Sequence, residues 1–192
     1  MGSNWLFEWI GPLYDRVLGG LDLGPLRQHI DLPAGRLLDV GGGTGRVARA
    51  LQGQVEMAVI VDVAWGMVRL VRRHPGLLPV QAVAERLPFA DGTFDRVLIV
   101  DALHHVIDAA RALEEMARVL RPGGLLVIEE LDIRRWAVKG ISLVERALGL
   151  RSRFLPPQAL QARLAALGLE ARIHEEPAGL RFWAIGRKPT DA

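Results

Sequence analysis

The chain has 192 residues, half of them hydrophobic and 24% charged, which suits one domain with a sizeable buried core. The formal net charge is only +2, and nearly all basic residues are arginine, so charge alone does not favour a nucleic-acid partner. The absence of cysteine excludes disulfides, thiolate metal sites and cysteine nucleophiles. There is no signal-peptide pattern and no apolar run near the roughly 20 residues that span a bilayer, so we expect a cytoplasmic protein without an integral membrane segment.

The first 35 residues are expected to form a small helical cap. Apolar side chains recur at helical spacing over residues 4–18, although Gly11-Pro12 interrupts the pattern. A second short helix is predicted over residues 25–30, and Pro33-Ala34-Gly35 forms a turn that leads into the first strand. This segment is predicted to cover the core of the domain.

The stretch RLLDVGGGTGRVARAL, residues 36–51, opens the predicted core. A short apolar strand over residues 37–40 leads through a turn with four glycines into a helical pattern. Such a turn lets the backbone approach a ligand closely, with main-chain N–H groups pointing at it. Asp39 lies at the carboxyl end of the strand, where ligands bind in open α/β sheets. The stretch therefore predicts a site for a nucleotide-like cofactor.

Strands and helices then alternate, which predicts an α/β fold with a doubly wound, mostly parallel sheet. The expected strands cover residues 56–62, 78–83, 94–100 and 125–130, and the expected helices run from Trp65 to near His74 and over residues 108–120.

The end of the chain has a different pattern. A helix over residues 157–167 precedes two strand-like runs, 170–175 and 181–186, that are separated by Pro177-Ala178-Gly179. The seven-stranded, Rossmann-like sheet is therefore expected to finish in an antiparallel hairpin. We expect a single domain over residues 1–192, made of the cap (1–35), a cofactor-binding core (36–130), a substrate-side segment (131–156) and the terminal helix and hairpin (157–192).

Two glycine patterns overlap in the opening stretch and indicate different cofactors. Gly43-x-Gly45-x-x-Ala48, with Asp62 about 20 residues further on, satisfies the dinucleotide fingerprint and favours a nicotinamide-dependent oxidoreductase. The other pattern, Asp39-x-Gly41-x-Gly43-x-Gly45, resembles the first motif of the class I S-adenosylmethionine-dependent methyltransferases.

The resemblance to these methyltransferases continues along the chain in the expected order. It includes the D-x-S-x-x-M segment, with Ala64 in place of serine, and the D-A-E-x-L-P-F-x-D-x-S-F-D block. Tyr14-Asp15 resembles the Y-D of the cap in the ubiquinone/menaquinone-type subgroup. The segments that carry the resemblance are residues 62–67, 84–95, 103–106 and 120–124.

The resemblance implies S-adenosylmethionine as cofactor and S-adenosylhomocysteine as product. In such a site Asp39 receives the methionine ammonium, Asp62 accepts from both ribose hydroxyls and Val63 packs on the adenine face. The remaining residues of the expected cofactor site are Gly41, Gly43, Ala84, Glu85, Val100 and Tyr14.

One departure from the family pattern concerns adenine. The aspartate that accepts from the adenine amino group in the family is Val83 here. Either Glu85 or a backbone carbonyl takes over this contact, or the selectivity for adenine is weaker.

His104, His105 and Asp101 are the candidate catalytic residues. A histidine just past the carboxyl end of a strand can act as a general base, since its ordinary pKa lies near neutrality. Alternatively, one histidine packs under the next helix, and methyl transfer needs only alignment of the reacting groups. The sequence singles out no metal site.

Residues 131–155 interleave basic and apolar side chains. This pattern is expected to help build the substrate site, to recognise an acidic substrate or to lie on a membrane surface as a peripheral contact; the alternative is a covering helix with a solvated arginine face. Trp65 and Met67 are expected to pack in the core or on a helix, and Glu114-Glu115 to form a solvated helix face.

The function expected from the resemblance is methyl transfer from S-adenosylmethionine to a small-molecule or lipid/quinone-like acceptor. The fourth strand ends Val100-Asp101-Ala102-Leu103, unlike the segment found in methyltransferases that act on nucleic-acid amino groups. A nicotinamide-dependent oxidoreductase and a non-catalytic S-adenosylmethionine-binding module are the alternatives. The identity of the acceptor and the oligomeric state stay open.

Overall fold

The structure is a computed structural model that describes residues 24–147, 152–176 and 179–190. The segment 4–18 of the expected cap, with Tyr14, lies outside the described residues. In chain order the elements are α2 (Gly24–Ile30), β1 (Ala34–Val40), α3 (Arg46–Ala50), β2 (Val55–Asp62), α4 (Trp65–Val71), β3 (Leu77–Gln81), β4 (Phe94–Val100), the 3₁₀ turn η1 (Leu103–His105), α5 (Ala109–Val119), β5 (Leu120–Leu131), α6 (Trp136–Ala147), α7 (Pro157–Ala166), β6 (Glu170–Glu175) and β7 (Arg181–Arg187).

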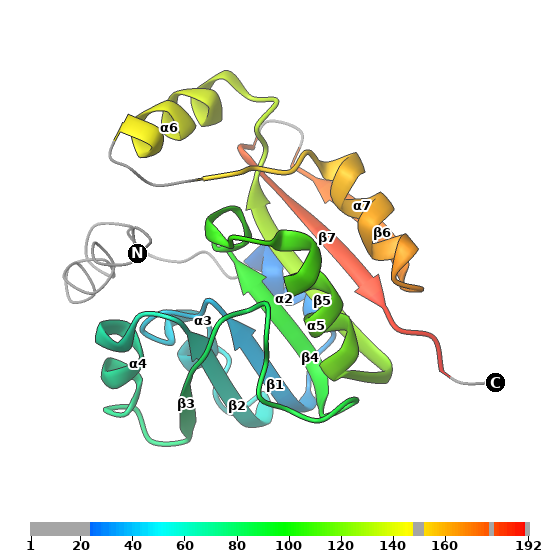
Figure 1. Ribbon diagram of the computed structural model, residues 1–192. Coiled ribbons are helices and arrows are strands. Elements are labelled where there is room, and N and C mark those ends of the chain that lie inside the picture. Colours follow the sequence, from blue (N-terminus) through cyan, green and yellow to red (C-terminus); the bar gives the residue numbers. More distant parts are fainter. Residues whose placement is uncertain (1–23, 148–151, 177–178, 191–192) are drawn as a thin grey trace.

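The strands form one seven-stranded sheet in the order β3-β2-β1-β4-β5-β7-β6 (Figure 1). The first five strands are parallel, and β7 runs antiparallel between β5 and β6. The predicted parallel sheet with a terminal hairpin is therefore confirmed. Because β7 is inserted in the opposite direction, its first residues lie at the same edge of the sheet as the carboxyl ends of the parallel strands.

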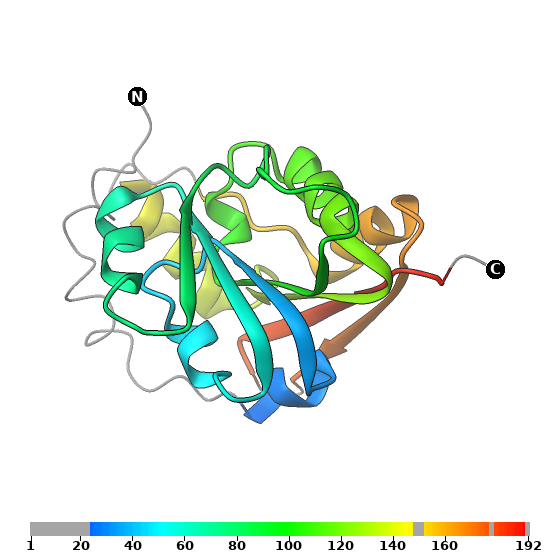
Figure 2. The same ribbon diagram turned by 90° about the horizontal axis from the view of Figure 1, so that it is seen from below.

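The sheet separates two hydrophobic cores. Leu38 and Val40 of β1 face the core that α5 and α7 cover, while Leu37 faces the core that α2 and α3 cover. Figure 2 shows the two sets of helices on opposite sides of the twisted sheet. Since both faces are buried, the strands read as continuous apolar runs rather than as alternating ones.

The Pro122-Gly123-Gly124 turn does not precede β5, as expected from the sequence, but lies within it. The pairing of β4 with β5 jumps from Phe94↔Leu120 to Arg96↔Leu125, so the residues between them form an irregularity in the strand. Gly123 has φ +74°, a backbone conformation that suits glycine.

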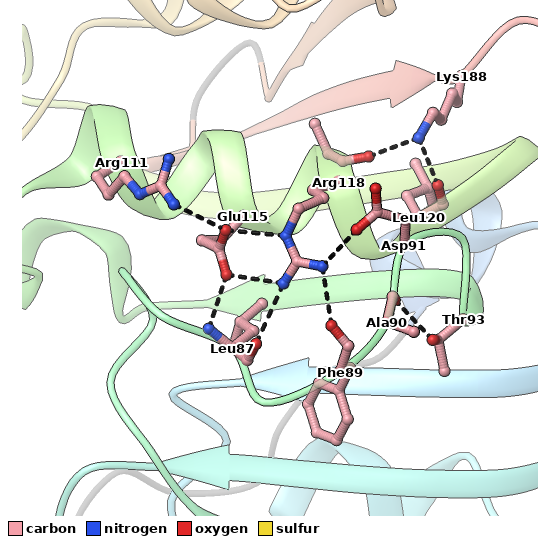
Figure 3. Close-up of polar contacts among 11 residues, drawn as sticks. Leu87, Phe89, Ala90, Asp91, Thr93, Arg111, Glu115, Arg118, Leu120 and Lys188 are labelled. Carbon is pink, nitrogen blue, oxygen red and sulfur yellow. Dashed lines mark hydrogen bonds and ion pairs between the residues drawn. The ribbon is translucent and has the colours of Figure 1, made fainter.

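The prediction that Glu114-Glu115 is a solvated face is wrong for Glu115, whose residue is only 4% exposed. Its carboxylate accepts from the backbone N–H of Leu87 at 2.9 Å and from the guanidinium of Arg118 at 2.9 Å through each oxygen (Figure 3). Arg118 in turn donates to the carbonyls of Leu87 and Phe89. Hydrogen bonding to Arg118 is the main cause of the lowered pKa of Glu115.

This network gives the motif block after β3 a structural role. The loop between β3 and β4 carries the resemblance to the methyltransferase block, and Glu115 and Arg118 attach it to α5 (Figure 3). The i,i+3 spacing of the two residues places both on the same face of the helix.

Helix α6 packs on the rest of the protein through a small part of its surface. Among its side chains only Val138 is buried, and the helix lies beyond the carboxyl ends of the strands (Figure 1). Trp136 is 84% exposed, and the Lys139 ammonium lies 4.4 Å from the centre of its ring.

Candidate functional site

A pocket opens at the carboxyl ends of β1, β2 and β4, where the sequence predicts the cofactor site. Eight of the expected residues line it: Gly41, Gly43, Asp62, Val63, Ala84, Glu85, Asp101 and His105. The rest of the lining is apolar, and most of it comes from the loops after β3 and β4: Val40, Val61, Met67, Ala82, Val83, Ile99, Ala102, Val106 and Ile107.

The glycines of the turn have separate physical roles. Gly41 has φ +66°, and a Cβ there would lie 2.7 Å from the Cβ of Ala102, so the loop after β4 packs directly on it. Gly43 has φ +56°, but no described atom lies within 4 Å of the position of a Cβ. The turn is thus closed against the protein at Gly41 and leaves open space beside Gly43, where a ligand group fits.

Asp39 lies beneath this turn, is 1% exposed and does not itself line the pocket. Gly45, the N-cap residue of α3, has no side chain that could cap the helix, and the backbone amide of Ala48, in the first turn of α3, donates to the Asp39 carboxylate. The other oxygen, Oδ2, is buried and has no hydrogen-bond partner among the described residues. Burial raises the pKa of Asp39 to about 7, and the negative charge of Asp62 acts in the same direction. The hydrogen bond from the backbone of Ala48 acts in the opposite direction and lowers the pKa.

Asp62 is held in one orientation by the backbone on both sides of the pocket. Its Oδ2 accepts from the N–H of Gly43 at 3.0 Å and its Oδ1 from the N–H of Ala64 at 2.8 Å. A carboxylate oxygen can accept more than one hydrogen bond, so both oxygens can still accept from a pair of hydroxyls. The carboxylate that the resemblance assigns to the ribose is therefore preorganised at the pocket wall.

Val63 and Val83 add apolar surface to the pocket lining, and both are exposed, at 41% and 44%. Glu85 was one candidate to take over the adenine contact that an aspartate makes in the family. Its carboxylate is already engaged, because Oε1 accepts from the N–H groups of Ile107 and Asp108 at 3.1 Å. Val100 does not line the pocket; it packs against the core under α2 and α3, while Ile99 and Asp101 beside it point to the pocket side.

Asp101 lines the pocket in a left-handed backbone conformation, with φ 52°. Arg181, at the start of β7, donates to both of its oxygens at 2.6 Å and to Oε1 of Glu129 at 2.8 Å. Trp183 donates to the other oxygen of Glu129. Burial raises the pKa of Glu129. Asp101 is thus part of an ion-pair network with Arg181 and Glu129.

The two histidines have different environments. His104 is 4% exposed; its Nδ1 lies 2.8 Å from Oε2 of Glu130, and its ring stacks on Phe154 with the ring centres 4.3 Å apart. Burial lowers the pKa of His104, but the hydrogen bond and the charge of Glu130 outweigh it, so the net pKa is raised. His105 lines the pocket, and burial, followed by the charge of His104, lowers its pKa to about 3.

The sequence interpretation missed Glu129, Glu130 and Arg181. The first two were visible as an acidic pair that ends the otherwise apolar run LLVIEE of a predicted buried strand. Arg181 left no local signal, because its role depends on β7 pairing with β5.

Comparisons with known proteins identify the family of the chain. A family model described as a methyltransferase domain matches residues 38–128. A demethylmenaquinone methyltransferase of Thermus thermophilus is 34% identical over 96% of this chain and 100% of its own length. One from Beutenbergia cavernae is 44% identical over 69% of this chain, and the match spans 59% of that protein, so the chain covers less than two thirds of some of its relatives.

A solved structure of an S-adenosylmethionine-dependent methyltransferase from Thermotoga maritima has the same fold. Its TM-score is 0.79 at 24% sequence identity, and the match covers 97% of this chain and all of that one. The fold, the glycine turn with its two acids and the end-to-end match to the Thermus protein lead to one conclusion. The chain belongs to the class I S-adenosylmethionine-dependent methyltransferases of the ubiquinone/menaquinone type.

Proposed function

We propose that this protein transfers a methyl group from S-adenosylmethionine to a quinone-like aromatic acceptor and releases S-adenosylhomocysteine. The observation that carries the proposal is the pocket at the carboxyl ends of the strands, with Asp62 clamped between Gly43 and Ala64 at its wall. Two relatives named demethylmenaquinone methyltransferase support the class of acceptor.

The described residues fit the cofactor in two places. The buried Oδ2 of Asp39 lacks a partner among the described residues, and the methionine ammonium is a cation that can supply one, directly or through water. The open space beside Gly43 leaves room next to the backbone for the same end of the cofactor. When bound, the cofactor supplies an electrophilic methyl group on a sulfonium sulfur.

The protein's own residues bind and orient the reactants. Asp62 accepts from the ribose hydroxyls, and Val63 and Val83 pack against the adenine ring. The side chain of Val83 cannot accept a hydrogen bond, and Glu85 is engaged with the loop after η1, so the backbone at Ala84 reads the adenine edge. Tight positioning of the acceptor against the methyl group supplies most of the rate, and His105, at the pocket wall, faces the acceptor.

The nicotinamide alternative has no support in this geometry. Gly45, the second glycine of the dinucleotide pattern, does not line the pocket, and its Cβ position faces Leu77, Val71 and Ile60. It serves helix–sheet packing rather than ligand approach.

The acceptor side of the site is proposed to include the segment 131–156. No helix among the described residues has the length and apolar character to cross a membrane. Helix α6 exposes Trp136, Leu143 and Val144. These side chains, together with Lys139 and Arg146, suit peripheral contact with a surface that carries a lipid-like acceptor.

Two measurements test the function. Calorimetry with S-adenosylmethionine and S-adenosylhomocysteine is expected to show one site per chain. Release of S-adenosylhomocysteine is then measured with a demethylated menaquinone analogue kept in its reduced, hydroquinone form, and the product mass is expected to increase by one methyl group. Absence of cofactor binding by the folded protein would refute the methyltransferase function, and binding without turnover on quinone analogues would refute the acceptor class.

A further inference from the structure

A cluster of three potential metal ligands lies at the edge of the pocket. His104 and His105 of η1 and Glu145 of α6 each offer one ligand atom, and these atoms lie within 4.8 Å of one another. Over the described ranges, no other set of three such side chains is grouped this closely. The three residues come from two segments about 40 positions apart in the sequence, so the sequence pattern gives no sign of the group.

His104 is oriented as metal-binding histidines are. Its Nδ1 interacts with both carboxylate oxygens of Glu130, at 2.8 and 3.1 Å, which leaves Nε2 as the nitrogen for a metal. Phe154 stacks on the ring and fixes its plane. A carboxylate behind a histidine sets the tautomer and raises the basicity of the ligating nitrogen.

The other two members also suit a cation. His105 offers an imidazole, the commonest metal ligand in proteins, at the pocket wall; its ring centre lies 4.0 Å from that of His104, and its Nδ1 lies 3.4 Å from the hydroxyl of Ser152. Oε2 of Glu145 is buried and accepts no hydrogen bond from the described residues. A buried carboxylate oxygen without a donor is costly, and a bound cation removes that cost.

We propose that His104, His105 and Glu145 bind one divalent transition-metal ion, with Zn²⁺ as the representative of its class. Two imidazoles and one carboxylate form a ligand set used for Zn²⁺ and for Fe²⁺, and they leave coordination positions open. Since His105 also lines the pocket, an open position faces the acceptor.

The role of the ion rests on the proposed function. An acceptor hydroxyl bound to the ion loses its proton more readily, and the ring carbon beside it becomes more nucleophilic. The carbon–carbon bond to the methyl group then forms as the carbon–sulfur bond breaks. The electron pair of the broken bond stays on sulfur, and the proton on that ring carbon leaves to solvent, which restores the aromatic ring. The acceptor is the reduced, hydroquinone form, whose hydroxyl proton leaves to solvent when the oxygen binds the ion and returns when the product dissociates, so that one proton is released per methyl group transferred.

The test of binding uses the full chain after removal of metal by a chelator. Titration with Zn²⁺ in a calorimeter is expected to show one equivalent, and titration with Co²⁺ is expected to give the visible absorption bands of a protein-bound ion. Glu145→Gln is expected to weaken Zn²⁺ binding at least tenfold. Glu114→Gln is the matched control, because Glu114 is half exposed on α5 and pairs only with Arg111 among the described residues. This variant is expected to bind Zn²⁺ as tightly as wild type does.

A second variant, Glu130→Gln, tests the positioning of His104 and is expected to weaken Zn²⁺ binding by about 10- to 100-fold. Circular dichroism confirms that each variant is folded, and Glu145→Gln on the exposed helix α6 keeps the test decisive if Glu130→Gln does not fold. Equal affinities for Glu145→Gln and Glu114→Gln, or the lack of a stoichiometric Zn²⁺ site, would overturn the proposal.

Binding of S-adenosylmethionine to the metal-free protein separates this proposal from the proposed function. If the cofactor binds and Zn²⁺ does not, the metal site is refuted and the methyltransferase function stands. If Zn²⁺ binds with the expected dependence on Glu145 and the cofactor does not bind, the metal site is supported and the proposed function fails.

Discussion

Replacing Asp39 by asparagine is expected to stabilise the folded protein at pH 8 while weakening cofactor binding. Burial raises the pKa of this carboxyl from 3.8 to about 7, so at pH 8 the native state contains an ionised group that it holds at a cost. The change in pKa corresponds to about 4 kcal/mol as an upper limit. Asparagine keeps an acceptor for Ala48 but places an amide group where Oδ2 is buried, which costs about 1–2 kcal/mol. The net gain expected at pH 8 is about 2–3 kcal/mol.

The sign of the pH dependence identifies the cause. Well below pH 3.8, Asp39 is protonated in both the folded and the unfolded state, and the two proteins differ only by the cost of burying the amide group. As the pH rises from 3.8 to about 7, the unfolded chain ionises Asp39 while the native state keeps its proton, so wild type loses stability and Asp39→Asn does not. Urea unfolding of both proteins at pH 4.5, 6 and 8 measures the difference. A difference that is the same at all three pH values refutes the reasoning.

The same variant tests the role of Asp39 toward the cofactor. The methionine ammonium favours the ionised carboxylate, so binding by wild type is expected to release close to one proton at pH 6, and Asp39→Asn is expected to release none. The affinity of Asp39→Asn for S-adenosylmethionine is expected to be about tenfold lower than that of wild type, which corresponds to about 1.4 kcal/mol. Calorimetry in buffers of different ionisation enthalpy measures both quantities, and proton release that persists in the variant contradicts the assignment.

Three further predictions concern single side chains. Asp62→Ala is expected to lower affinity for S-adenosylmethionine without unfolding the domain; unchanged affinity removes Asp62 from the site. Gly41→Ala is expected to lower the free energy of unfolding by roughly 2–4 kcal/mol, because of the φ of +66° at Gly41 and its contact with Ala102. Gly140→Ala, in open space on α6, is the control and is expected to leave stability unchanged or slightly increased; thermal unfolding of both variants measures the difference. Glu115→Ala is expected to cost roughly 2–4 kcal/mol at pH 7 and Glu114→Ala less than about 0.5 kcal/mol. Since the pKa of Glu115 is lowered below 4.5, mainly by Arg118, its stabilisation is present above pH 4.5 and is lost as the pH falls through the lowered value; a cost independent of pH down to acid unfolding counts against this account.

Where one segment supplies the geometry, the residues that the sequence assigns to the cofactor site lie at the pocket. The glycine turn after β1 and the acid that ends β2 are local patterns, and both lie at the pocket as expected. The sequence predicted Asp39 and Val100 less well, since it indicated only that they lie near the carboxyl ends of their strands. Asp39 lies beneath the turn, and Val100 packs against the opposite core.

The order of strands and helices, the terminal hairpin and the family were determined by the sequence alone, because apolar periodicity and glycine turns act over a few residues at a time. Only the tertiary structure decided which charges became buried. Glu115 is buried because the loop after β3 folds back over α5, and Arg181 reaches Asp101, 80 positions earlier, because β7 enters the sheet antiparallel beside β5. The proximity of His104, His105 and Glu145 likewise depends on where α6 lies. The cost of burying a charge depends on its neighbours in space, and these are set only when distant segments pack together.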